Sequence, residues 1–245
     1  MSYEAPKAEV RDHEVREYRD SSQLAKWTVW LLFAEIAMTV IAIWSGWEER
    51  RMLNAMEAGA FGNQEAMEAA AMFSDRRQAR IAQASAVLFI FCGVVTLRWI
   101  HRMCNNATVN AKAMQFTPGW AVGWYFIPIA NIWKPFQAMK EIWGESARQA
   151  GPQGREPGGL LGAWWTLWLS YSLLTNVAFQ IARRITSIAD ALTANSFAVA
   201  GDVAFVALSG VLIMVVKRVT AMQVYAHENP LDPAMANQAP GANWA

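Results

Sequence analysis

Residues 113–133 read AMQFTPGWAVGWYFIPIANIW, a stretch without a single charge. A helix of this length is long enough to cross a bilayer, which takes about 20 apolar residues. The stretch also contains Pro118, Gly119, Gly123 and Pro128, and proline breaks the backbone hydrogen bonds that a lipid-exposed helix must keep. Whether this segment crosses the membrane or turns back therefore decides the topology of the whole chain.

The composition around this stretch is that of a membrane protein. Hydrophobic residues make up 54% of the 245-residue chain and charged residues 17%, whereas ordinary globular proteins are about 25% charged. The apolar residues gather in long runs flanked by tryptophans and basic residues, as in helices that cross a bilayer. We therefore predict an all-α, polytopic membrane protein with crossing helices at about residues 27–47, 81–100, 160–182 and 196–216.

The distribution of Lys and Arg favours four crossing helices over five. If residues 113–146 do not cross, 14 Lys and Arg side chains lie on the side of the N-terminus and 7 on the other side; if they cross, the two sides carry 10 and 11. Cytoplasmic loops of membrane proteins are enriched in Lys and Arg. We therefore expect four spans with both termini cytoplasmic, and a Pro/Gly-broken segment at 113–146 that re-enters the membrane or lies on its cytoplasmic face.

Three further segments lie outside the bilayer in this scheme. Residues 1–26 are densely charged and precede an apolar run too long for a signal peptide, which predicts a cytoplasmic segment before a retained anchor. Residues 48–80 have helix-forming composition with breakers only at 59–63, which predicts an extramembrane helical hairpin on the opposite side. The membrane domain then covers 27–220, and the proline-containing residues 221–245 form a disordered cytoplasmic tail.

The sequence lacks the residue patterns of common catalytic and metal sites. It has two Cys and three His, none at the spacing of a zinc site, and no nucleophile motif or phosphate-binding loop. We therefore expect no enzyme activity, no metal and no cofactor. The net charge of +1 argues against a nucleic-acid partner, since such binding depends on a basic surface.

Three ionisable residues fall inside predicted spans. Glu35 and Arg98 lie in the first and second spans at similar expected depth, so we expect them to contact each other or to share a buried polar partner. Such a pair is either a structural ion pair or part of a proton or substrate relay. Asp202 lies near the start of the last span, where we expect it to pair with Arg183 or Arg184.

The broken segment continues into a longer motif, because residues 116–143 read FTPGWAVGWYFIPIANIWKPFQAMKEIW. This motif resembles the signature of the bacterial membrane family known as domain of unknown function 4328. The resemblance covers about residues 27–220 and implies a bacterial membrane protein with the motif between its second and third spans; it implies no activity. We expect the protein to lie in the bacterial cytoplasmic membrane. It rests on matching positions at Pro118, Gly119, Trp120, Gly123, Trp124, Pro128, Asn131, Trp133, Pro135, Gln137, Met139 and Trp143.

The broken segment is the best candidate for a binding site. Non-helical backbone at membrane depth is tolerated only where protein buries it or where it lines a cavity. We expect the rings of Trp120 and Trp124 to form an apolar groove with the spans, and Asn131 and Gln137 to point toward backbone groups or a ligand. After Pro135, an amphipathic helix should lie in the headgroup plane, its apolar face formed by Phe136, Met139, Ile142 and Trp143.

Two functions fit these observations. The first is a non-enzymatic module that binds a protein partner or an amphiphile such as a lipid through the candidate residues Pro118, Gly119, Trp120, Gly123, Trp124, Pro128, Asn131, Trp133, Pro135 and Gln137. The second is a small oligomeric transporter or channel that uses Glu35, Arg98 and the broken helix. Alternatively, the prolines, glycines and tryptophans only specify a tight fold. The expected partners are the lipid bilayer and either a membrane protein or further copies of the chain.

Overall fold

The computed structural model describes residues 17–109 and 114–230, and within these ranges the chain is helical and has no strand. The first 16 residues and the last 15, which hold most of the predicted N-terminal segment and tail, lie outside the described residues. The helices are α1 (Ser22–Glu57), α2 (Gln64–Thr108), α3 (Pro118–Gly123), α4 (Lys134–Gln149), α5 (Leu160–Ala182) and α6 (Ile188–Glu228), with short 3-10 turns η1 (Trp124–Phe126), η2 (Ile129–Ile132) and η3 (Gly151–Gln153).

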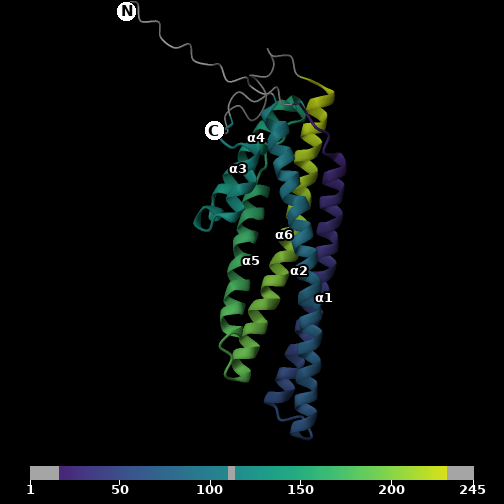
Figure 1. Cartoon of the computed structure of the whole chain (residues 1–245), viewed down its shortest axis with the longest axis vertical. Helices are drawn as coiled ribbons and strands as arrows, with labels where there is room; N and C mark the ends of the chain where they lie inside the picture. Colours follow the sequence, from purple (N-terminus) through teal and green to yellow (C-terminus); the bar gives the residue numbers. More distant parts are fainter. Residues whose placement is uncertain (1–16, 110–113, 231–245) are drawn as a thin grey trace, which may run out of the picture.

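The long helices α1, α2, α5 and α6 form an elongated bundle (Figure 1). The helix α6 packs along both α5 and α1, while α2 packs mainly on α1. The described parts of α2 and α5 share no packed interface. The beginning of α1 and the end of α6 lie together at one end, which we call the terminal end, and the α1–α2 and α5–α6 turns lie at the opposite, turn end (Figure 1).

The turn between α1 and α2 falls at the breakers that the sequence places at 59–63. Gly59 adopts a positive φ of 62°, which favours glycine, and the Asn63 side chain caps α2 by accepting a hydrogen bond from the Ala66 amide at 2.8 Å. The arms of this hairpin are joined by polar contacts rather than by ion pairs. Gln78, for example, donates to the Glu49 carboxylate at 2.8 Å.

Three helices, α1, α2 and α6, are long and apolar enough to cross a membrane. Many of their large apolar side chains point outward and are exposed, as lipid-facing side chains are. The helix α5 has 23 residues and no charge, but its Ser, Thr, Asn, Gln and Trp residues leave it without an 18-residue stretch as apolar as those in the other three helices. Three of the four predicted spans are thus supported by both length and composition.

The best-packed part of the core lies at the terminal end, where α2, α4, α5 and α6 meet. The α4 side chains Met139, Ile142 and Trp143 are almost completely buried there. This corrects the expectation that α4 lays its apolar face on the lipid headgroups. The amphipathic pattern is real, but α2 and α6 cover the apolar face, so the pattern reports packing within the protein.

Candidate functional site

The motif folds into short helical pieces instead of one long helix. Thr117 caps α3 by accepting a hydrogen bond from the Trp120 amide at 3.4 Å, and Pro118 occupies the first helical position, where a missing N–H costs nothing. Pro128 then separates η1 from η2, and Pro135 stands in the first turn of α4. Each proline thus begins or interrupts a segment, as its chemistry predicts.

The two ends of the motif are held together. The Glu141 carboxylate on α4 accepts hydrogen bonds from the backbone amides of Gln115, at 2.5 Å, and Phe116, at 3.0 Å. At the end of α4, Gln149 donates to the carbonyl of Ala107, near the end of α2, at 2.7 Å. The segment therefore leaves the terminal end and returns to it within the described residues.

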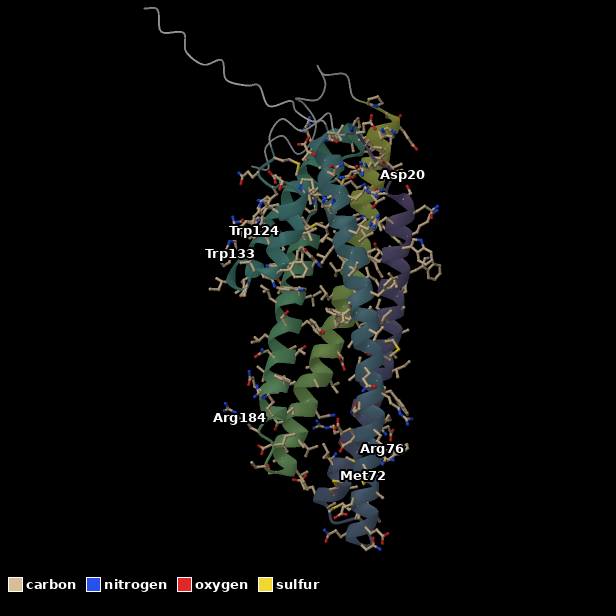
Figure 2. The ribbon with its side chains drawn as sticks, viewed as in Figure 1. Asp20, Met72, Arg76, Trp124, Trp133 and Arg184 are labelled. Atoms are coloured by element: carbon tan, nitrogen blue, oxygen red, sulfur yellow. The ribbon has the colours of Figure 1, made fainter. Side chains whose placement is uncertain are left out.

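The tip of the motif, residues 126–133, is apolar and largely exposed. Phe126 and Ile129 are 72% and 73% exposed, and Trp133 lies on the side that faces away from the α1–α2 hairpin (Figure 2). The Trp165 indole on α5 donates to the Ile132 carbonyl at 3.0 Å. Because Trp165 comes five residues after the start of α5, the tip lies about 7.5 Å along α5 from its first residue.

A cavity of about 320 Å³, which we call the central cavity, lies beside this tip. Its walls come from α1, α2, α5 and α6, with Met139 of α4, and the motif contributes Tyr125, Phe126 and Asn131. No Lys, Arg or His side chain lines it. Most of the lining is apolar, and its aromatic members are Phe89, Trp99, Tyr125, Phe126, Trp164, Trp168, Tyr171 and Phe205.

Four polar atoms in the wall of the central cavity are buried without a hydrogen-bond partner in the described structure. They are Glu35 Oε1, Tyr125 OH, Asn131 Oδ1 and Ser209 Oγ. Glu35 and Ser209 are only 3% and 1% exposed. Buried polar groups are nearly always hydrogen-bonded, and each unsatisfied one costs about 1–3 kcal/mol. Their convergence on one cavity indicates a place for a polar molecule or for the polar end of a larger one.

Ser209 differs from other hydroxyls in the long helices. The hydroxyls of Ser172 and Thr175 on α5 donate to the carbonyls four residues earlier, each at 2.8 Å, which is the usual solution for a hydroxyl in a membrane helix. The Ser209 hydroxyl makes no such bond and is turned into the cavity wall. The Ser209 hydroxyl is therefore available to form a hydrogen bond with a molecule inside the central cavity.

The residues that the sequence singled out in the motif divide into two groups. Asn131 lines the central cavity, as expected of an amide near a ligand site. Trp120 and Trp124 do not line it; their rings pack on each other with centroids 4.7 Å apart, and Trp120 is 52% exposed. Gln137 is exposed on the outer face of α4. The groove expected at Trp120 and Trp124 is therefore not the central cavity, whose aromatic wall comes from α2, α5, α6 and the motif residues Tyr125 and Phe126.

The expected contact between Glu35 and Arg98 is also wrong. Glu35 faces the central cavity, whereas Arg98 is exposed and lines a different groove on the outside of α1 and α2. On α2 the neighbours Leu97 and Trp99 line the cavity, and each residue of a helix turns about 100° from the next, so Arg98 points away.

Asp202 likewise forms no ion pair with Arg183 or Arg184 among the described residues. Asp202 lies 14 residues into α6 from Ile188, about 21 Å along the helix axis from the turn where the two arginines lie. The guanidinium of Arg183 instead lies over the Phe179 ring, 5.6 Å from its centroid. The expectation placed Asp202 near the turn because the apolar run begins at about residue 196. The helix α6 begins earlier, at Ile188, so Asp202 lies further from the turn than the apolar run suggests.

The family model described as Domain of unknown function (DUF4328) matches residues 62–221 of this chain. The chain belongs to this family. The resemblance seen in the motif is thus confirmed, although the match begins in the α1–α2 turn and leaves α1 outside. The DUF4328 region contributes Tyr125, Asn131 and Ser209 to the central cavity, while Glu35 comes from the part of the chain before it. Neither a curated protein nor a solved structure matches the chain.

Sequence reasoning missed Tyr125, Ser209 and the α5 tryptophans Trp164 and Trp168. Tyr125 lies inside the motif, where the sequence does not distinguish it from the other aromatic residues. Ser209 is an isolated hydroxyl well inside the apolar run of α6, which by itself predicts a bond to its own helix. Only the three-dimensional structure shows that these residues face one cavity.

Proposed function

We propose that this DUF4328 protein is a non-enzymatic module of the bacterial cytoplasmic membrane that binds an amphiphile in its central cavity. Four helices, α1, α2, α5 and α6, cross the bilayer, both termini are cytoplasmic, and the motif re-enters from the cytoplasmic side. The crossing of α5 is supported by its uncharged 23 residues and by its packing along α6. The exposed apolar tip of the motif supports its insertion among lipid chains.

The observation that carries the proposal is the set of four unpartnered polar atoms in an otherwise apolar cavity. A few convergent polar groups in an apolar pocket are typical of ligand sites. A carboxyl group, an amide oxygen and two hydroxyls all accept hydrogen bonds. With no basic side chain in the lining, the site favours a head group that donates hydrogen bonds, such as a hydroxyl or an amine, over an anionic one.

The same geometry provides a place for the apolar tail. Aromatic and aliphatic side chains make up the rest of the wall. Side chains of α2 and of α5 both line the cavity, and the proposal places the apolar chain between these two helices, directed toward the bilayer. The transporter interpretation rested on the broken helix and on Glu35 acting together with Arg98, and the separation of these two side chains removes the second support.

The proposal is tested by thermal unfolding in phosphatidylcholine nanodiscs with decanol, decylamine or decanoate at equal concentration. Decanol and decylamine should raise the unfolding temperature, because both carry donors, and decanoate should not. Ser209→Ala should weaken the affinity for decanol roughly 2- to 13-fold, as expected for one hydrogen bond of about 0.5–1.5 kcal/mol.

Ser172→Ala is the matched control, because this hydroxyl bonds to its own helix and does not line the cavity. It should leave the affinity for decanol unchanged. Equal affinities in the two variants, or equal stabilisation by all three compounds, would contradict the proposal.

A further inference from the structure

A second groove, which we call the outer groove, lies on the outside of α1 and α2 at the terminal end. It has a volume of about 500 Å³ and shares no lining residue with the central cavity. Its lining is Asp20, Gln23, Leu24, Trp27, Phe91, Val95, Arg98 and Arg102. The inference below does not depend on what the central cavity binds, and it shares with the proposed function only the orientation of the terminal end toward the cytoplasm.

The outer groove changes from charged to apolar along the bundle axis. On α2, Arg102 and Arg98 lie nearer the terminal end, and Val95 and Phe91 follow one and two turns further into the predicted span. On α1, Trp27 is largely exposed beside them, at the position where tryptophans of membrane helices meet the headgroup layer. The groove thus has a cationic end at headgroup level and an apolar end at acyl-chain level.

The cationic end is built from two guanidinium groups on one helix face. Arg98 and Arg102 are four residues apart, so their side chains are neighbours. The Arg102 guanidinium donates to the Asp20 carbonyl at 2.9 Å, which holds it in place. Arg98 is exposed and makes no hydrogen bond or ion pair with another described residue.

Asp20, at the rim of the groove, does not neutralise both arginines. Its carboxylate accepts hydrogen bonds from the Ser22 amide, at 2.9 Å, and the Ser22 hydroxyl, at 2.7 Å, and these bonds hold the pKa of Asp20 below its usual value. One carboxylate beside two guanidinium groups leaves the groove with a net positive charge. Arginine is well suited to bind phosphate, since its planar donors match two phosphate oxygens.

We propose that the outer groove binds an anionic glycerophospholipid. Its phosphate lies between Arg98 and Arg102, and one acyl chain lies along Val95 and Phe91. The apolar half of the groove selects a lipid over a free phosphate ion. The cationic and apolar ends of the groove follow each other in the same order as the phosphate and the acyl chains of a lipid in the cytoplasmic leaflet.

The proposal is tested by native mass spectrometry of the full chain released from nanodiscs that contain equal amounts of palmitoyl-oleoyl phosphatidylglycerol and phosphatidylcholine. The wild-type chain should retain phosphatidylglycerol in preference to phosphatidylcholine. The double variant Arg98→Gln/Arg102→Gln should lose this preference at least tenfold. Arg98→Gln alone should lose part of it, and this variant keeps the Arg102–Asp20 contact and hence the local fold.

Lys217→Gln/Arg218→Gln is the matched control, because both side chains are exposed near the terminal end of α6 and removing them changes the charge equally. This variant should retain phosphatidylglycerol like the wild type. Equal retention by all variants, displacement of the lipid by inorganic phosphate alone, or a second copy of the chain bound in the lipid's place would overturn the proposal. The response to decanol should be the same in all these variants, which separates this test from that of the central cavity.

Discussion

Glu141 should be the residue on which the return of the motif to the terminal end depends most. Its carboxylate accepts two backbone hydrogen bonds, from Gln115 and Phe116. A hydrogen bond to a charged group contributes about 1.5–3 kcal/mol, and the bond to Gln115 counts for less because it is exposed. Glu141→Ala should therefore destabilise the closed motif by about 2–4 kcal/mol, which corresponds to a roughly 30- to 700-fold increase in its local opening.

Hydrogen–deuterium exchange of the 114–123 segment in nanodiscs measures this opening directly. Glu141→Gln should give an intermediate effect, because its amide oxygen still accepts one bond while its NH₂ group faces the other donor. Glu156→Gln is the control, since Glu156 is exposed and lies outside the motif. If Glu141→Ala exchanges at the same rate as Glu156→Gln in this segment, the Glu141 contacts do not hold the motif closed and the reasoning fails.

Three further predictions follow from single contacts. Trp165→Phe should speed the amide exchange of the 126–133 tip, because it removes the bond to the Ile132 carbonyl, worth about 0.5–1.5 kcal/mol; unchanged exchange would show that the tip is held otherwise. Gly154→Ala should lower the unfolding temperature, because a Cβ there would lie 2.1 Å from the Ala147 carbonyl oxygen and overpacking costs about 1–3 kcal/mol. Gly162→Ala should leave the unfolding temperature unchanged, because a Cβ at that position meets nothing within 4 Å. Hydrogen bonds from Thr186 lower the pKa of Asp190. The stabilisation of the start of α6 by the Asp190 carboxylate should therefore be complete above about pH 4 and should disappear as the pH falls through the lower folded-state pKa. Asp190→Asn should remove this pH dependence from the amide exchange of residues 186–192.

The sequence predicted those parts of the fold that depend on local chemistry. Apolar runs gave the long helices, the breakers near Gly59 gave the turn of the hairpin, and Pro118, Pro128 and Pro135 fall at the boundaries of the motif pieces. These features follow from backbone restrictions that each residue carries with it.

The contacts between helices could not be predicted in the same way. Whether Arg98 meets Glu35 depends on the rotation of α2 about its axis, which the apolar pattern of a membrane helix leaves open because lipid and protein are both apolar. For the same reason the apolar face of α4 could face lipid headgroups or a protein core, and the structure shows that α2 and α6 cover it. The central cavity joins residues from seven helices and turns, so no single stretch of sequence reveals it.

The most direct test of the central claim is photo-cross-linking of a diazirine-bearing decanol to the full chain in phosphatidylcholine nanodiscs, followed by peptide mapping. The account predicts label on two segments that line the central cavity, residues 125–131 of the motif and 164–171 of α5. This label should disappear with excess unlabelled decanol. Label confined to outward side chains such as Phe33 and Val203, or label that excess decanol does not compete away, would contradict the account.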